Sequence, residues 1–344
     1  MEYGAIDLHK RSSHIRIVRA DGSVVLEQKI VTAREEFARV FGSSIGMRIL
    51  LESGTESEWV AQHLETLGHE VVVADPNFLP MYGSRSRRVK TDRRDVAALA
   101  EACRTGMYRR AHRAGSATRA LRRTLRVRTH LVRARTNAIS VLRSLLRQDG
   151  IRVGTGASEQ ILTHLDRVTV PPVLAAAVAP LRALLGELNR LLEEANAMVE
   201  ARAAADPITR RLMTVPGVGP VVAVTFRAVL DEPSRFGGDA RRASAFVGVV
   251  PSEDSSAERQ HKGHITKTGP RDLRALLVQA SWVIWRSRRA AAQPLRAWAH
   301  ALAARRGRRI AMVAVARRLT RILFALWRDE TTFGAPRRRV AAVA

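Results

Sequence analysis

The sequence is poor in cysteine and in aromatic residues. A single cysteine, Cys103, excludes an internal disulfide and a zinc site built on cysteines. No apolar run reaches the roughly 18 residues of a membrane-spanning helix, and no basic-then-apolar leader precedes the first predicted strand. Aromatic residues make up only 5%, which disfavours an amphipathic membrane-surface anchor. We therefore expect a cytoplasmic protein with no membrane contact.

Acidic residues are also scarce. The 344 residues hold 58 lysines and arginines against 32 aspartates and glutamates, a formal net charge of +26. Such a field attracts polyanions, and arginine grips phosphates through a planar fork of donors. The expected partner is DNA or RNA, and the expected location is the nucleoid.

Residues 1–108 alternate between predicted strands and helices. Apolar runs predict strands at 3–9, 15–19, 24–28, 47–52 and 70–74. Asp21-Gly22 indicates a tight hairpin between the second and third. Three antiparallel strands followed by helix-linked parallel strands is the order of the ribonuclease-H-like α/β fold, which we expect for this domain.

Four acidic residues in this region predict a metal site. Asp7 lies within a strand, Glu52 ends another, and Asp92 and Asp95 begin a helix with both carboxylates on one face. A buried carboxylate is costly unless it is paired or holds a cation, and two Mg²⁺ ions on oxygen ligands suit phosphoryl transfer. The simpler interpretations are helix capping for the two aspartates beside Thr91 and an exposed strand end for Glu52.

Residues 109–205 read as long helices that form coiled-coil seams or a helical hairpin, and we expect them to mediate self-association and contact nucleic acid. The predicted seams are Leu121, Leu125, Val132, Ile139, Leu142 and Leu146, then Leu181, Leu184, Leu188, Leu191, Ala195 and Met198. Seven arginines accompany the first seam: Arg122, Arg123, Arg126, Arg128, Arg133, Arg135 and Arg143. They form either a solvated charged face or a phosphate-binding face, with Arg122, Arg126 and Arg133 as the candidate contacts.

Residues 206–332 form another predicted helical domain, followed by a basic tail at 333–344. The turn at 215–220 resembles a helix-hairpin-helix turn, in which backbone amides near Gly217 and Gly219 would grip a DNA phosphate. A polar segment without periodicity spans 248–269. There Lys262, Lys267 and Arg271 are candidate phosphate contacts.

Across nearly its whole length the chain resembles the DEDD-type insertion-sequence transposases, which have a RuvC-like domain first and a transposase domain last. The resemblance rests on Ile6–Lys10, Leu51–Gly54, Lys90–Asp95, Val215–Pro220, Gly248–Ser252 with Ser255 and Ser256, Gly263–Lys267, and Val313–Arg317. It implies that Asp7, Glu52, Asp92 and Asp95 bind two catalytic Mg²⁺ ions. It also implies a structured noncoding guide RNA and a dimer or tetramer as partners of the DNA-bound enzyme.

The resemblance further implies a serine nucleophile that forms a covalent phosphoserine with DNA. The family pattern favours Ser256 over Ser255, although Ala257 stands where the family has glycine. Two other functions stay open from the sequence: a structure-selective, metal-dependent nuclease that uses water, and a non-catalytic nucleic-acid-binding protein.

Overall fold

The computed structural model describes residues 1–43, 46–83, 91–253 and 262–334. The chain divides into two compact units, Met1–Arg113 and Ala114–Ala344, each with its own core. No helix within the described ranges is both long enough and apolar enough to span a membrane.

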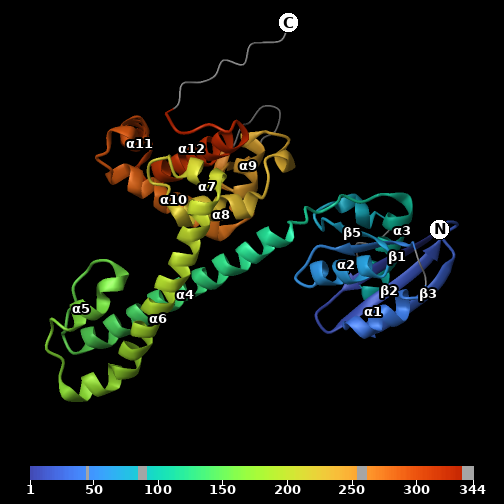
Figure 1. Cartoon of the computed structure of the whole chain (residues 1–344), viewed down its shortest axis with the longest axis horizontal. Helices are drawn as coiled ribbons and strands as arrows, with labels where there is room; N and C mark the ends of the chain where they lie inside the picture. Colours follow the sequence, from blue (N-terminus) through green and yellow to red (C-terminus); the bar gives the residue numbers. More distant parts are fainter. Residues whose placement is uncertain (44–45, 84–90, 254–261, 335–344) are drawn as a thin grey trace, which may run out of the picture. The chain divides into compact units, whose positions relative to one another are not determined.

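The first unit is a five-stranded sheet with helices on both faces (Figure 1). Its elements are β1 (Glu2–Leu8), β2 (Ser12–Arg19), β3 (Val24–Val31), α1 (Arg34–Phe41), β4 (Arg48–Glu52), α2 (Ser57–Thr66), β5 (Glu70–Ala74), the 3₁₀ turn η1 (Leu79–Tyr82) and α3 (Asp92–Thr105). The strand order is β3-β2-β1-β4-β5, with β1 to β3 antiparallel and β4 and β5 parallel to β1. The predicted order of strands is confirmed.

Strand alternation divides the core of this unit into two layers. Side chains such as Ile6 and Leu51 pack with Phe37 and other residues of α1 and α2. Their strand neighbours, such as Ala5 and Leu50, face the other way and pack with α3. Because successive side chains point to opposite faces, every second residue of β1 and β4 lies on the α3 face.

The second unit begins with a helical hairpin made of α4 (Ser116–Gln148) and α6 (Pro172–Ala205), with the short α5 (Ile161–Leu165) at its tip (Figure 1). The predicted seam of α6 is confirmed at Leu188, which is buried, and at Leu181, which packs against the core. It is wrong by one residue elsewhere: Leu184 and Met198 are exposed, whereas Leu185, Leu192 and Val199 are buried. Because leucines are adjacent at 184–185 and at 191–192, the sequence fits two heptad frames. Packing against α4 selects the frame that also buries Val199.

The remaining helices gather around α12 at the other end of the hairpin. They are α7 (Pro207–Leu212), α8 (Pro220–Leu230), α9 (Ala240–Val247), α10 (Arg271–Arg286), α11 (Gln293–Arg306) and α12 (Arg308–Arg328). Phe226, Phe324 and Trp327 lie in their shared core. The segment predicted to be aperiodic contains two short antiparallel strands, β6 (Pro251–Glu253) and β7 (Lys262–Ile265).

Candidate metal centre and nucleic-acid-binding surfaces

Parallel pairing brings two of the predicted acidic residues to one edge of the sheet. Ile6 of β1 lies opposite Leu51 of β4, so the next residues, Asp7 and Glu52, come at the carboxyl ends of adjacent strands. Alternation directs both side chains to the face that α3 covers. Two carboxylates far apart in sequence thus become neighbours.

Helix α3 adds the other two. It begins at Asp92, and its cap is the Thr91 side chain, which accepts a hydrogen bond from the Arg94 backbone amide at 3.3 Å. The helix therefore has a cap other than its aspartates. Asp95 is buried, with 7% of its surface exposed, whereas half of the Asp92 side chain is exposed.

Sheet register and side-chain distances bring the acidic residues near one another, and the pKa of Asp7 is affected by the other three. Burial raises the pKa of Asp7; His9 opposes this shift, and the negative charges of Glu52, Asp95 and Asp92 reinforce it. Each of the three must lie close enough to Asp7 to repel its charge. The structure thus brings all four predicted acidic residues to one place.

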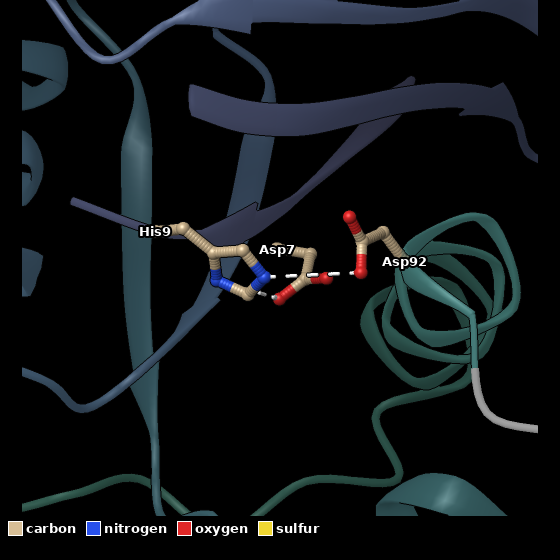
Figure 2. Close-up of side chains that lie close together, drawn as sticks. All are labelled: Asp7, His9 and Asp92. Atoms are coloured by element: carbon tan, nitrogen blue, oxygen red, sulfur yellow. Dashed lines mark ion pairs between the residues drawn. The ribbon is translucent and has the colours of Figure 1, made fainter. Parts of the chain in front are cut away.

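His9 completes a cluster that sequence reasoning missed (Figure 2). Its Nδ1 lies 3.8 Å from Asp7 Oδ1, and its Nε2 lies 3.8 Å from Asp92 Oδ1. Asp7, His9 and Asp92 offer ligand atoms that all lie within 4.8 Å of one another. The sequence offered one signal for His9: it follows Asp7 by two residues, and residues two apart in a strand point to the same face.

Glu52 is held by a residue that gave no sequence signal. The Tyr82 hydroxyl, on the 3₁₀ turn η1, donates a hydrogen bond to Glu52 Oε1. Beside Glu52 lies a cavity of about 390 Å³, which Lys10 and Gly54 also line. The acidic cluster therefore borders open space that a substrate can enter.

The donor set fits a hard divalent cation. It consists of carboxylate oxygens and one imidazole. Burial raises the pKa of Asp7, and the neighbouring carboxylates add to this shift, so a bound cation would offset both effects. Lys29 places its Nζ 4.0 Å from Asp92 Oδ2.

Several of the seven arginines along the first helix of the hairpin have partners within the protein. Arg122 donates from Nε to the Ala228 carbonyl at 2.7 Å and from Nη2 to the Val229 carbonyl at 3.2 Å. Burial lowers its pKa. Arg133 pairs with Asp272. Two others are also paired within the hairpin: Arg128 donates to Asn196 of α6 at 2.7 Å, and Arg135 pairs with Glu159 of the connecting segment at 2.7 Å.

A basic cavity nevertheless forms where α4 meets α8 and the start of α10. It encloses about 330 Å³, and four arginines line it: Arg122, Arg123, Arg126 and Arg271. Three of these four are predicted nucleic-acid contacts, and they come from two distant parts of the sequence. Arg126 and Arg271 are exposed.

The turn between α7 and α8 has a second basic cavity. It encloses about 520 Å³ and is lined by Gly217, Gly219, Arg286 and Arg289 among others. Gly217 has φ +80°, and a Cβ there would come within 2.8 Å of the Ala280 carbonyl oxygen. A Cβ on Gly219 would meet nothing within 4 Å. Gly217 is thus required by packing, whereas Gly219 borders open space.

The late segment is described only in part. Ser255, Ser256, Ala257 and His261 lie outside the described residues, as does the side chain of Lys262. Lys267 is exposed and has a left-handed backbone with φ +55°, which is uncommon for a residue other than glycine.

Comparison with known proteins finds transposases along nearly the whole chain. Residues 5–149 match a family of DEDD transposases of the IS110 type, described as Transposase, and residues 209–296 match the Transposase IS116/IS110/IS902 family. A probable family 20 transposase of Pseudomonas aeruginosa is 29% identical over 95% of this chain and 97% of its own length. The transposase for insertion sequence element IS1328 of Yersinia enterocolitica is 26% identical over the same shares.

A third relative, the transposase for element IS1111A of Coxiella burnetii, is 25% identical over 91% of this chain and 85% of its own. The fold, the acidic cluster and these matches define an enzyme that cleaves DNA and transfers its strands, with DNA as substrate. The chain belongs to the DEDD-type IS110 family of insertion-sequence transposases.

Proposed function

We propose that the first unit is a ribonuclease-H-like domain in which Asp7, Glu52, Asp92 and Asp95 hold two Mg²⁺ ions and direct the cutting of DNA. The observation that carries the proposal is that Asp7 and Glu52, at the carboxyl ends of adjacent strands, lie beside Asp92 and Asp95 at the start of α3. Bound there, the ions would neutralise charge on the entering and leaving oxygens of a phosphodiester.

The surrounding side chains hold this arrangement in place. Tyr82 fixes the orientation of Glu52 through its hydroxyl. His9 lies between Asp7 and Asp92, with a ring nitrogen 3.8 Å from each. Lys10 lines the adjacent cavity, where its ammonium group suits an incoming phosphate.

The nucleophile in this proposal is the hydroxyl of Ser256, with Ser255 as the alternative. Its oxygen attacks the phosphorus, a phosphoserine bond forms, the bond to one strand breaks, and that strand's oxygen leaves with a proton. Serine needs activation by a base or metal, which the carboxylate cluster supports. A guide RNA and a dimer or tetramer complete the proposal; the family membership and the charge of +26 support the RNA.

A denaturing gel tests the reaction. DNA carrying an end of the insertion sequence, incubated with Mg²⁺ and the element's own RNA, should yield broken strands and a protein–DNA adduct. Asp7→Asn should lose both while binding DNA as the wild type does. Ser256→Ala should lose the adduct, with Ser255→Ala as its matched control. Cleavage without an adduct that survives Ser256→Ala would mean that water is the nucleophile.

The turn between α7 and α8 is proposed to contact a DNA phosphate through its backbone, and its two glycines separate binding from folding. Gly219→Ala adds a methyl group in open space at the cavity, so it should weaken DNA binding and leave stability unchanged. Gly217→Ala should destabilise the unit, since its Cβ meets a carbonyl oxygen at 2.8 Å. Unchanged DNA affinity in Gly219→Ala would refute a phosphate contact at this turn.

A further inference from the structure

A third basic cavity lies at the tip of the helical hairpin, away from the two basic cavities described above. It encloses about 370 Å³, between the end of α4 and the loop that follows. Its lining residues are Ser140, Arg143, Arg147, Arg152, Val153 and Thr155. Three arginines thus surround one small space.

The positive charge of this cavity is not neutralised locally. In the part of the chain that the structure describes, none of its three arginines forms an ion pair, whereas Arg135 on the same helix pairs with Glu159. The Arg143 Nε atom is buried and has no hydrogen-bond partner. Concentrated cationic charge with a buried donor left unsatisfied is costly unless an anion binds.

Local geometry directs the arginines into the cavity. Arg143 and Arg147 are four residues apart and share one face of α4, and Arg152 comes from the loop. Arg143 Nη2 also donates to the Gly154 carbonyl at 3.1 Å, which holds the loop against the helix. Arg147 and Arg152 remain exposed. One arginine therefore shapes the cavity, and two are left to meet a ligand.

The spacing along α4 indicates what that ligand is. Arg126, in the basic cavity beside α8, precedes Arg147 by 21 residues, a distance of about 32 Å at ~1.5 Å per residue. At 100° per residue, a 21-residue step returns to within about 60° of the same helix face. A duplex repeats its backbone about every 34–36 Å, so one lying along α4 presents phosphates to both cavities.

We propose that the tip cavity binds the phosphodiester backbone of a nucleic-acid duplex that extends along α4. This inference rests on the proposed function, because it concerns the same nucleic acids. It adds a contact about one duplex turn from the Arg126 cavity. The duplex can be substrate DNA or a helical stem of RNA, because both carry the same phosphate chemistry.

The test uses Arg147→Gln/Arg152→Gln in the full chain, with Arg167→Gln/Arg190→Gln as a charge-matched control. All four arginines are exposed on the same hairpin, and the control pair lies outside the cavity. Probes are a 30-base-pair DNA duplex and an RNA duplex of equal sequence. Loss of two phosphate contacts should reduce the slope of log affinity against log salt concentration on DNA by about 1.8. If the two proteins bind equally at 1 M salt, this change corresponds to about 60-fold weaker binding by the variant at 0.1 M.

The control should change neither slope by more than half of that amount. In the wild type, the favoured duplex should protect Arg147 and Arg152 from phenylglyoxal. An effect with the DNA probe alone identifies substrate, an effect with the RNA probe alone identifies a guide stem, and either supports the site. Equal slopes for the two double variants, with Arg147 and Arg152 unprotected, would overturn it. Strand cleavage by the same variants reports separately on the carboxylate cluster.

Discussion

Asp7→Asn separates the two roles of the acidic cluster, catalysis and folding. In the wild type, burial raises the pKa of Asp7, with further contributions from Glu52, Asp95 and Asp92. Folding therefore disfavours the charged form. The contribution of this group to stability is present at low pH and is lost as pH rises through its folded-state pKa. Without metal, the asparagine variant should be at least as stable as the wild type at pH 7, and the difference in stability should develop as pH rises from acidic values through the folded-state pKa of Asp7.

Bound Mg²⁺ should reverse this order. A ligand at ten times its Kd stabilises the folded state by RT ln 11, about 1.4 kcal/mol. Amides of β1 and β4 that exchange only when the sheet opens should therefore exchange about tenfold more slowly in the wild type with Mg²⁺ than without it. In the variant, where one of four carboxylate ligands is neutral, Mg²⁺ at the same concentration should change exchange little.

Hydrogen exchange of β1 and β4 peptides, measured in EDTA and in Mg²⁺, provides the assay. Asp21→Asn is the matched control, because Asp21 lies in the β2–β3 hairpin turn, where asparagine also fits. It should retain the full metal response and full strand cleavage. If Mg²⁺ protects Asp7→Asn as strongly as the wild type, the cluster does not hold the metal through Asp7 and the reasoning fails.

Three further predictions concern single side chains. Tyr82→Phe removes the hydroxyl that orients Glu52, so cleavage should slow by about tenfold or more while DNA affinity stays constant, because a hydrogen bond to a charged group contributes about 1.5–3 kcal/mol; an unchanged rate would show that this contact is dispensable. Leu185→Ala should lower the free energy of unfolding by about 2–5 kcal/mol and Leu184→Ala by less than about 1 kcal/mol, and urea denaturation that ranks them in reverse would contradict the observed seam. Cys103, whose burial raises its pKa to about 12, should resist iodoacetamide at pH 8 until the first unit unfolds, and rapid labelling of the native protein would refute its burial.

Much of the first unit could be predicted from its sequence because its signals are local. Alternating apolar runs and the Asp21-Gly22 turn give the strands, and helix-linked strands pair in parallel. Asp7 and Glu52 were identified because a carboxylate in an apolar strand conflicts with burial, and Asp92 and Asp95 because they share one face at the start of a helix. His9 and Tyr82 were missed, because their roles depend on which residues of other elements the fold brings to them.

The hairpin shows where sequence patterns stop being sufficient. Consecutive leucines at 184–185 and 191–192 fit two heptad frames, and only packing against α4 decides between them. Arginines on one helix look equivalent in sequence. In the folded protein Arg133 pairs with Asp272 and Arg135 pairs with Glu159, and only the fold shows which arginines have such internal partners.

The bond from Arg122 to the end of α8 affects how charge-removal experiments on this enzyme must be interpreted. A scan that replaces each arginine in turn will record weaker DNA binding at this position even if no phosphate ever touches it. The change would leave two carbonyls at the end of α8 without their partner and loosen the junction between hairpin and helical core. Only a measurement of unfolding made beside each binding curve distinguishes a lost contact with DNA from a weakened scaffold.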